Sequence, residues 1–252
     1  MQILMYHSVG RHPDDYLSVA PEAFRRQMEW LAERGRGQET LSQALARPDR
    51  PRESVVVTFD DAYADNYEEA FPILKEFGLT ATIFAIPGAM GRRPDWTDAH
   101  PVAPLLDWGQ VREMSQAGFE FGSHTMTHLD VCAAPLAQVA EELSRSKVLL
   151  EEQLGQAITS FAYPYGYFRE EMPHLLNAAG YRWAVLADTY GYNTARTDPY
   201  QLRRVPIEGS DSLEVFARKA RGWYNWWYYP KKVRNEARFQ VKMLQKRLSR
   251  GH

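Results

Sequence analysis

Short apolar, β-rich runs alternate with helical segments over most of the chain, and this alternation constrains the fold more than any other feature. The expected strands are 2–6, 55–59, 80–86, 119–122, 158–163, 182–187 and 202–207. The helical patterns cover 21–34, 65–77 (with Asp65 as its N-cap), 108–117, 135–154, 169–179 and 211–221. Such alternation is typical of a parallel sheet with crossover helices. Seven units in about 210 residues favour an α/β barrel, or a near-barrel, over an open sheet.

The length and composition fit one ordinary globular domain. The chain has 252 residues, of which 44% are apolar and 25% are charged. A net charge of −2 gives no electrostatic reason to expect nucleic acid as a partner. Cys132 is the only cysteine, which excludes an intrachain disulfide and a cysteine-rich zinc site.

The last segment differs from the rest, so we divide the chain into a barrel domain (1–221) and a tail (222–252). The tail opens with six aromatic residues between Trp223 and Tyr229, and from Lys231 onward it has eight Lys or Arg against one Glu. Two interpretations fit: an aromatic and basic amphipathic helix lying at a membrane surface, or a terminal helix packed on the barrel.

The N-terminus lacks the pattern of a secretory signal, and no run of 18 apolar residues exists to span a membrane. The expected location is therefore the cytoplasm, with peripheral contact at the inner face of the membrane through residues 222–252.

Polar residues follow four of the expected strands at the point where each strand ends. His7 follows the first, Asp60-Asp61 the second, 123–128 the fourth and 164–166 the fifth. In α/β barrels the working residues stand at the carboxyl ends of the strands, so these clusters are expected to meet on one rim.

The spacing of His124 and His128 permits both imidazoles to share a cation. Asp60-Asp61 offers a third ligand, with one carboxylate on the cation and its neighbour free to act as a base. Two His and one carboxylate form the ligand set of an open catalytic zinc site. Zn²⁺ is the first choice, and Co²⁺, Ni²⁺ or Mn²⁺ could occupy the same ligands.

Three motifs together resemble those of a known family. Thr58-Phe59-Asp60-Asp61, Ser123-His124-Thr125-Met126-Thr127-His128 and Tyr163-Pro164-Tyr165-Gly166 resemble the polysaccharide deacetylases, which are carbohydrate esterase family 4 with its NodB-homology domain. The resemblance spans roughly residues 1–210. Met5-Tyr6-His7-Ser8 and the stretch 202–207 resemble the branch that contains the poly-β-1,6-N-acetylglucosamine deacetylases. The fold that this implies is a deformed (β/α)7 barrel.

The resemblance also implies roles for single residues. Asp61, His124 and His128 would bind the metal, and Asp60 would be the general base. The backbone N–H of Tyr165 would help to stabilise the tetrahedral oxyanion.

Two departures from the family pattern change the remaining assignments. The third motif has Ala162 where many members carry an Arg that orients the base, and no His follows the last strand. In the branch that the sequence resembles, a His at the end of the first strand takes the acid role, which makes His7 the candidate general acid, with a structural histidine as the alternative. The first and last strands of a closed barrel are neighbours, so this exchange is geometrically reasonable. Arg204 is a candidate for the missing Arg, on a strand expected on the Asp60 side of the rim, with a surface or structural salt bridge as the alternative.

The leading hypothesis is a metal-dependent hydrolase that removes an N-acetyl group from an amino sugar of a surface polysaccharide, a lipopolysaccharide or its lipid- or nucleotide-linked precursor. The alternatives are a deformylase or deacylase of a lipid-linked amino sugar, and a catalytically inactive carbohydrate-binding barrel. Substrate preference would depend on loops 88–107 and 187–200. Four aromatic residues could line a sugar site or belong to the core: Trp96, Trp108, Trp183 and Tyr190.

Overall fold

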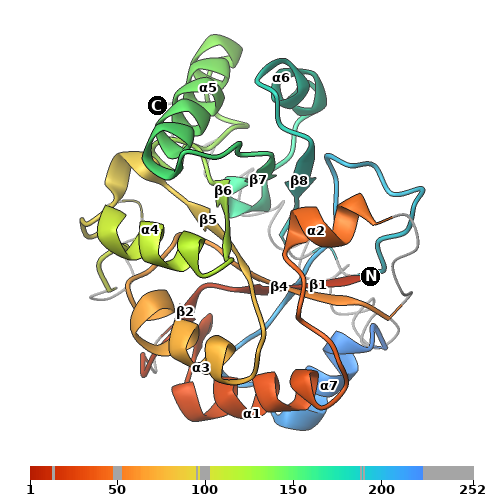
Figure 1. The fold of residues 1–252 in the computed structure, drawn as a ribbon. Helices are drawn as coiled ribbons and strands as arrows, with labels where there is room; N and C mark the ends of the chain where they lie inside the picture. The colour runs from red at the N-terminus through yellow and green to blue at the C-terminus, as the bar shows by residue number, and fades with distance from the viewer. Residues whose placement is uncertain are drawn as a thin grey trace, which may run out of the picture.

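A parallel sheet of seven strands forms the centre of the molecule (Figure 1). The computed structural model describes residues 1–12, 15–47, 53–94, 96, 103–187, 189 and 191–223. The strand order is β8-β7-β6-β5-β4-β1-β9. The strands are β1 (Gln2–Tyr6), β4 (Val55–Phe59), β5 (Thr82–Ala85), β6 (Glu120–Ser123), β7 (Ser160–Ala162), β8 (Trp183–Val185) and β9 (Val205–Pro206).

The segment that leads into β9 connects the two edges of this sheet. Leu202 forms a parallel bridge with Val185 of β8, and Val205 pairs with Leu4 of β1. The sheet therefore closes on itself, and the predicted deformed (β/α)7 barrel is confirmed. The first and last strands are neighbours, as expected.

Helices surround the strands on the outside (Figure 1). They are α1 (Pro21–Ala32), α2 (Leu41–Ala46), α3 (Phe71–Glu76), α4 (Trp108–Gln116), α5 (Leu136–Leu154), α6 (Met172–Ala178) and α7 (Leu213–Ala220). α1 begins with a proline, whose fixed φ suits the first helical position. α1 and α7 lie side by side, with the Trp30 and Phe216 rings edge to face at 5.7 Å. No helix in the described part of the chain is long and apolar enough to cross a membrane.

The strands divide their side chains between two buried layers because successive residues point to opposite faces. Val55 and Val57 of β4 pack under the helices, whereas Val56 faces a second cluster. This second cluster draws residues from strands all around the sheet and is the barrel interior; its members are Met1, Ile3, Leu41, Ala44, Val56, Phe84, Ala162, Val185 and Leu202. Because Asp60 lies four residues beyond Val56, the same parity directs its side chain to the interior mouth.

Some elements differ from the sequence-based expectations. α2 was not expected; its Thr40–Gln43 capping box is a short polar signal, and its Leu41 and Ala44 pack against the barrel interior. A short parallel pair of strands, β2 (Ser8–Val9) and β3 (Ser18–Val19), was also not expected. Residues 224–252, which make up nearly all of the expected tail, lie outside the described residues.

Asp65 does not act as the N-cap that the sequence predicts. The helix after it starts as a π-helical turn, η1 (Asn66–Ala70), and continues as α3. Asp65 already has helical dihedral angles and makes no side-chain cap. Its carboxylate instead accepts hydrogen bonds from the Ser8 hydroxyl at 2.5 Å and the Asn66 amide at 2.9 Å.

Candidate active site

The polar residues that follow the strands meet at the carboxyl end of the barrel, as the sequence predicts. Asp61, His124 and His128 each offer one ligand atom, and these atoms lie within 4.8 Å of one another. The Nε2 atoms of His124 and His128 are both 3.5 Å from Asp61 Oδ1. All three side chains are buried.

The acceptor atoms that this cluster leaves without hydrogen-bond partners can bind a cation. Asp61 Oδ1 is buried and has no hydrogen-bond partner in the described structure. His124 Nδ1 lies 2.9 Å from the carbonyl oxygen of Ala162. That nitrogen therefore donates its proton to the carbonyl, and Nε2 is left with its lone pair toward Asp61. One carboxylate oxygen and two imidazole nitrogens are the donors that Zn²⁺ and its neighbours in the transition series accept.

Burial also favours a neutral imidazole at His128. It lowers the pKa of His128 to about 4, although the nearby Asp61 carboxylate acts in the opposite direction. A neutral imidazole has the lone pair that a metal ligand requires.

The backbone of these motifs is strained. The non-glycine residues with positive φ among the described residues are Asp61, Ala62, Thr125, His128 and Tyr165. All of them belong to, or directly follow, the three motifs. Left-handed backbone at residues other than glycine is costly, and it concentrates where a site requires a particular side-chain direction.

Asp60 is held by Arg204 rather than by the cation ligands. Arg204 Nη1 is 2.6 Å from Asp60 Oδ1 and Nη2 is 2.7 Å from Oδ2, so the contact is bidentate. Arg204 Nε also donates to the Leu186 carbonyl oxygen at 2.7 Å. Burial raises the pKa of Asp60, but Arg204 and His124 outweigh it and bring the pKa to about 2.

Arg204 lies in the segment expected to form the last strand, 202–207, on the Asp60 side of the sheet, with one strand between it and β4. It lies just before β9, which pairs with β1, so β1 stands between it and the Asp60 strand β4. The long side chain spans this gap inside the barrel. A surface salt bridge is wrong for Arg204, because the side chain is fully buried, whereas an Arg that orients Asp60 and a structural salt bridge both fit the buried pair.

His7 follows β1 and lies beside the same group. Its imidazole lowers the pKa values of both Asp60 and His128, which places it in their electrostatic reach. Its Nδ1 is buried without a hydrogen-bond partner among the described residues. The Asn66 amide donates to the His7 carbonyl oxygen at 2.8 Å and fixes the backbone there.

Aromatic rings flank His128 on two sides. The Trp96 ring stacks on it with centroids 4.8 Å apart, and the Tyr165 ring meets it edge to face at 4.5 Å. Tyr165 is half exposed, and the centroid of its ring lies 5.4 Å from that of the Tyr167 ring. Of the other aromatic candidates, Trp183 packs on the barrel-interior cluster and Tyr190 lies outside the described residues.

Tyr63 is a site residue that sequence reasoning missed. Burial, followed by the charge of Asp61 and a side-chain hydrogen bond with it, raises the pKa of Tyr63. The hydroxyl thus remains a donor to the Asp61 carboxylate. Its position two residues after the candidate ligand Asp61 was the only available signal.

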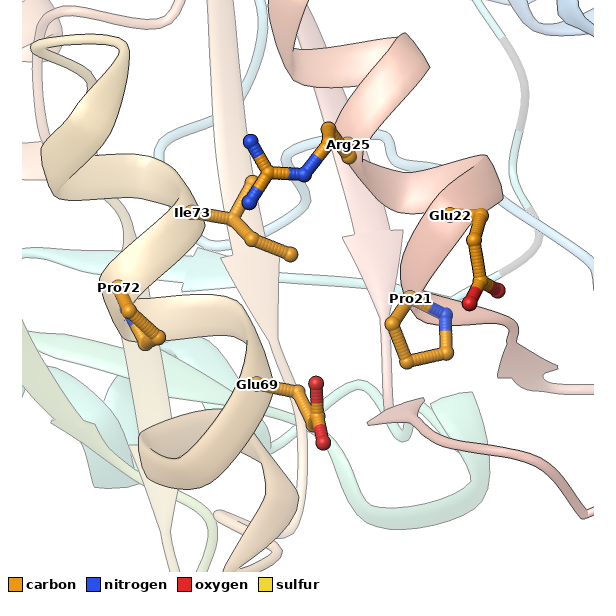
Figure 2. A pocket seen from close by; sticks show the side chains of 6 residues that line it. All are labelled: Pro21, Glu22, Arg25, Glu69, Pro72 and Ile73. Atoms are coloured by element: carbon orange, nitrogen blue, oxygen red, sulfur yellow. The ribbon is translucent and has the colours of Figure 1, made fainter.

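A separate surface hollow lies between α1 and the η1–α3 helix (Figure 2). Its lining residues are Pro21, Glu22, Arg25, Glu69, Pro72 and Ile73. None of them belongs to the groups described above, and the hollow is not part of the candidate site.

The polysaccharide deacetylase family model matches residues 47–184, more than half of the chain. The chain belongs to the polysaccharide deacetylase family. The matched range holds Asp60, Asp61, His124, His128 and Tyr165, whereas His7 and Arg204 lie on either side of it.

Relatives of this deacetylase-family chain match beyond that range. YxkH of Bacillus subtilis (strain 168), named as a candidate polysaccharide deacetylase, is 32% identical over 86% of this chain and 74% of its own length. The poly-beta-1,6-N-acetyl-D-glucosamine N-deacetylase of Staphylococcus aureus (strain MRSA252) is 26% identical over 82% of this chain and 73% of its own.

Solved deacetylase structures share the fold. The Streptococcus pyogenes deacetylase PplD in complex with acetate has a TM-score of 0.75 and 28% identity, covering 87% of this chain and 97% of its own. IcaB from Ammonifex degensii has a TM-score of 0.74 and 26% identity, covering 87% and 96%.

Proposed function

We propose that this deacetylase-family protein is a metal-dependent hydrolase that removes the N-acetyl group from an amino sugar of a surface polysaccharide, a lipopolysaccharide or its precursor. The single observation that carries the proposal is the pairing of two sites at one barrel mouth. One is the Asp61–His124–His128 cluster, and the other is a separate carboxylate, Asp60, which Arg204 holds in place.

Asp61, His124 and His128 would hold the ion in this proposal. A divalent ion bound there supplies Lewis acidity, which polarises the amide carbonyl and lowers the pKa of a neighbouring water. Tyr63 donates to Asp61 and keeps that carboxylate oriented.

Asp60 would act as the general base. Its pKa of about 2 keeps it ionised at neutral pH, so it can accept a proton from the attacking water. Arg204 binds both oxygens of Asp60 and fixes the direction from which the proton arrives. The Tyr165 N–H would donate to the oxyanion of the tetrahedral intermediate.

His7 would act as the general acid. When the C–N bond of the tetrahedral intermediate breaks, the amine must leave with an added proton, and the imidazole of His7 would supply it. The products are the free amino sugar and acetate.

Two observations support an amino-sugar substrate. The Staphylococcus aureus relative is named for poly-beta-1,6-N-acetyl-D-glucosamine. In addition, Trp96 and Tyr165 place flat aromatic faces beside His128, and such faces suit the apolar side of a sugar ring. The membrane contact of the tail remains a prediction, because residues 224–252 lie outside the described structure. The cytoplasmic location is also a prediction.

Acetate release from β-1,6-linked N-acetylglucosamine oligomers tests the proposal. We expect release by the Zn²⁺- or Co²⁺-loaded protein, loss after chelation, and a fall of about 100-fold or more in Asp60→Asn. Glu141→Gln, a surface change on α5, is the control and retains activity. An N-formyl substrate assayed in parallel separates the deformylase alternative, and full activity of Asp60→Asn contradicts the mechanism.

A further inference from the structure

The loop 124–128 supplies two of the three candidate ligands, and its conformation is unfavourable for its sequence. Thr125 has a φ of 65° and His128 a φ of 60°. The left-handed region is unfavourable above all for a β-branched residue such as Thr125. Contacts from outside the loop must therefore hold it in this shape.

The neighbouring strand β5 and the turn after it hold the backbone at the start and at the middle of the loop. The His124 N–H donates to the Ala85 carbonyl oxygen at 2.8 Å, and the Gly88 N–H donates to the Met126 carbonyl oxygen at 3.0 Å. A Cβ atom at Gly88 would lie 2.3 Å from that Met126 oxygen, so the close approach requires glycine. These contacts leave the N–H groups of Met126 and Thr127 without backbone partners.

The carboxylate of Glu142, on helix α5, accepts hydrogen bonds from the middle of the loop. Its Oε2 accepts the N–H of Met126 at 2.8 Å and the N–H of Thr127 at 2.9 Å. Its Oε1 accepts the Thr127 hydroxyl at 2.9 Å. Hydrogen bonds to an ionised acceptor are about twice as strong as neutral ones, so this single side chain is a strong clamp.

The same face of α5 also holds the strand that enters the loop. Ser146 stands one helical turn after Glu142, and its Oγ lies 2.8 Å from Oγ of Ser123, the last residue of β6. Residues four apart lie on one side of a helix. α5 therefore fixes both the strand end before His124 and the loop after it.

From these contacts, we infer that Glu142 is a positioning residue that holds His124 and His128 at the separation required to bind one cation. It does not touch the ion or the substrate. The inference rests on the proposed function in one respect, namely that the Asp61–His124–His128 cluster binds a divalent ion.

The test compares Glu142→Ala with a matched control, Glu141→Ala. Glu141 is the preceding residue of α5, and its side chain is 62% exposed in an ion pair with Arg145. Zn²⁺ affinity is measured by competition with a chromophoric chelator, and the geometry of the site by the visible spectrum of the Co²⁺-loaded protein. Hydrogen exchange of the Met126 and Thr127 amides is measured on the metal-free protein.

We expect Glu142→Ala to bind Zn²⁺ about 10-fold or more weakly, to change the Co²⁺ spectrum and to exchange both amides faster. Glu141→Ala should match the wild type in all three measurements. Glu142→Gln keeps an acceptor oxygen in the same place and should recover most of the affinity. If Glu142→Ala does not fold, Glu142→Asp carries the test, because the carboxylate is drawn back by one methylene while the charge remains.

Wild-type Zn²⁺ affinity in folded Glu142→Ala (or, in its place, Glu142→Asp), with unchanged exchange at Met126 and Thr127, overturns the inference alone. A wild-type protein that binds no divalent ion overturns the proposed function instead. The exchange measurement on metal-free protein still decides whether Glu142 holds the loop.

Discussion

Arg204 and Asp60 form a bidentate ion pair at the mouth of the barrel, with their nitrogen and oxygen atoms 2.6 and 2.7 Å apart. Both side chains are buried, and the guanidinium is held further by the Leu186 carbonyl oxygen and the Thr58 hydroxyl. A planar guanidinium matches both oxygens of a carboxylate, which an ammonium group cannot do. The pair therefore sets both the charge and the orientation of the proposed base.

Arg204→Lys tests the orientation of Asp60. Lysine keeps a positive charge but loses the second hydrogen bond, so kcat is expected to fall about 100-fold. Because Arg204 lowers the pKa of Asp60, its loss should also shift the acidic limb of the kcat profile to higher pH. Arg203→Lys, at the exposed neighbouring residue, is the control. An unchanged rate and pH profile in Arg204→Lys would exclude this role.

The same ion pair predicts how stability depends on pH. The folded-state pKa of Asp60, about 2, lies below the usual value of an unfolded Asp, about 3.9. Asp60 therefore contributes stability above pH 4 that is lost as the pH falls from 4 toward 2, amounting to about 2 kcal/mol.

Urea unfolding of the metal-free protein between pH 6 and pH 2.5 measures this contribution. Asp60→Asn is less stable at every pH, since it leaves Arg204 buried without its counter-charge. The decisive quantity is how the difference in unfolding free energy between wild type and Asp60→Asn depends on pH. This difference should shrink as the pH falls. A constant difference over this range would mean that Asp60 has no lowered pKa.

His7→Ala tests the assignment of the general acid. Its activity on an acetamido sugar is expected to fall by about 10²- to 10⁴-fold, because the amine cannot leave without a proton. An aryl acetate ester has a leaving group that needs no proton, so its hydrolysis should fall far less. His12→Ala is the control. Equal losses on both substrates would show that His7 serves another purpose.

Asp61 and His124 are candidate cation ligands in the sequence because they stand just after expected strands, and His128 because it lies four residues beyond His124. The parity of β4 and β6 predicts that Asp60 and His124 reach the barrel mouth, whereas Asp61 is out of phase with Asp60 and has a left-handed φ of 68°. The comparisons agree with the predicted family and fold.

The family resemblance made Arg204 a candidate partner of Asp60, but the local sequence pattern predicts no long-range contact. Arg204 and Asp60 are 144 residues apart, and only the closure of the barrel through residues 202–206 brings them together. Glu142 lies within an ordinary-looking amphipathic helix, where an inward glutamate has no distinguishing spacing. Asp65 has the sequence of an N-cap, but a serine on the adjoining strand β2 offered its carboxylate a better-placed donor.

Zn²⁺ binding to the chelator-treated protein, measured by equilibrium dialysis with metal analysis, tests the central claim most directly. The wild type is predicted to bind one ion per chain, and His124→Ala and Asp61→Asn to bind it far more weakly, with His12→Ala unaffected. One ion per chain in wild type and in all three variants, or none in the wild type, would contradict the account.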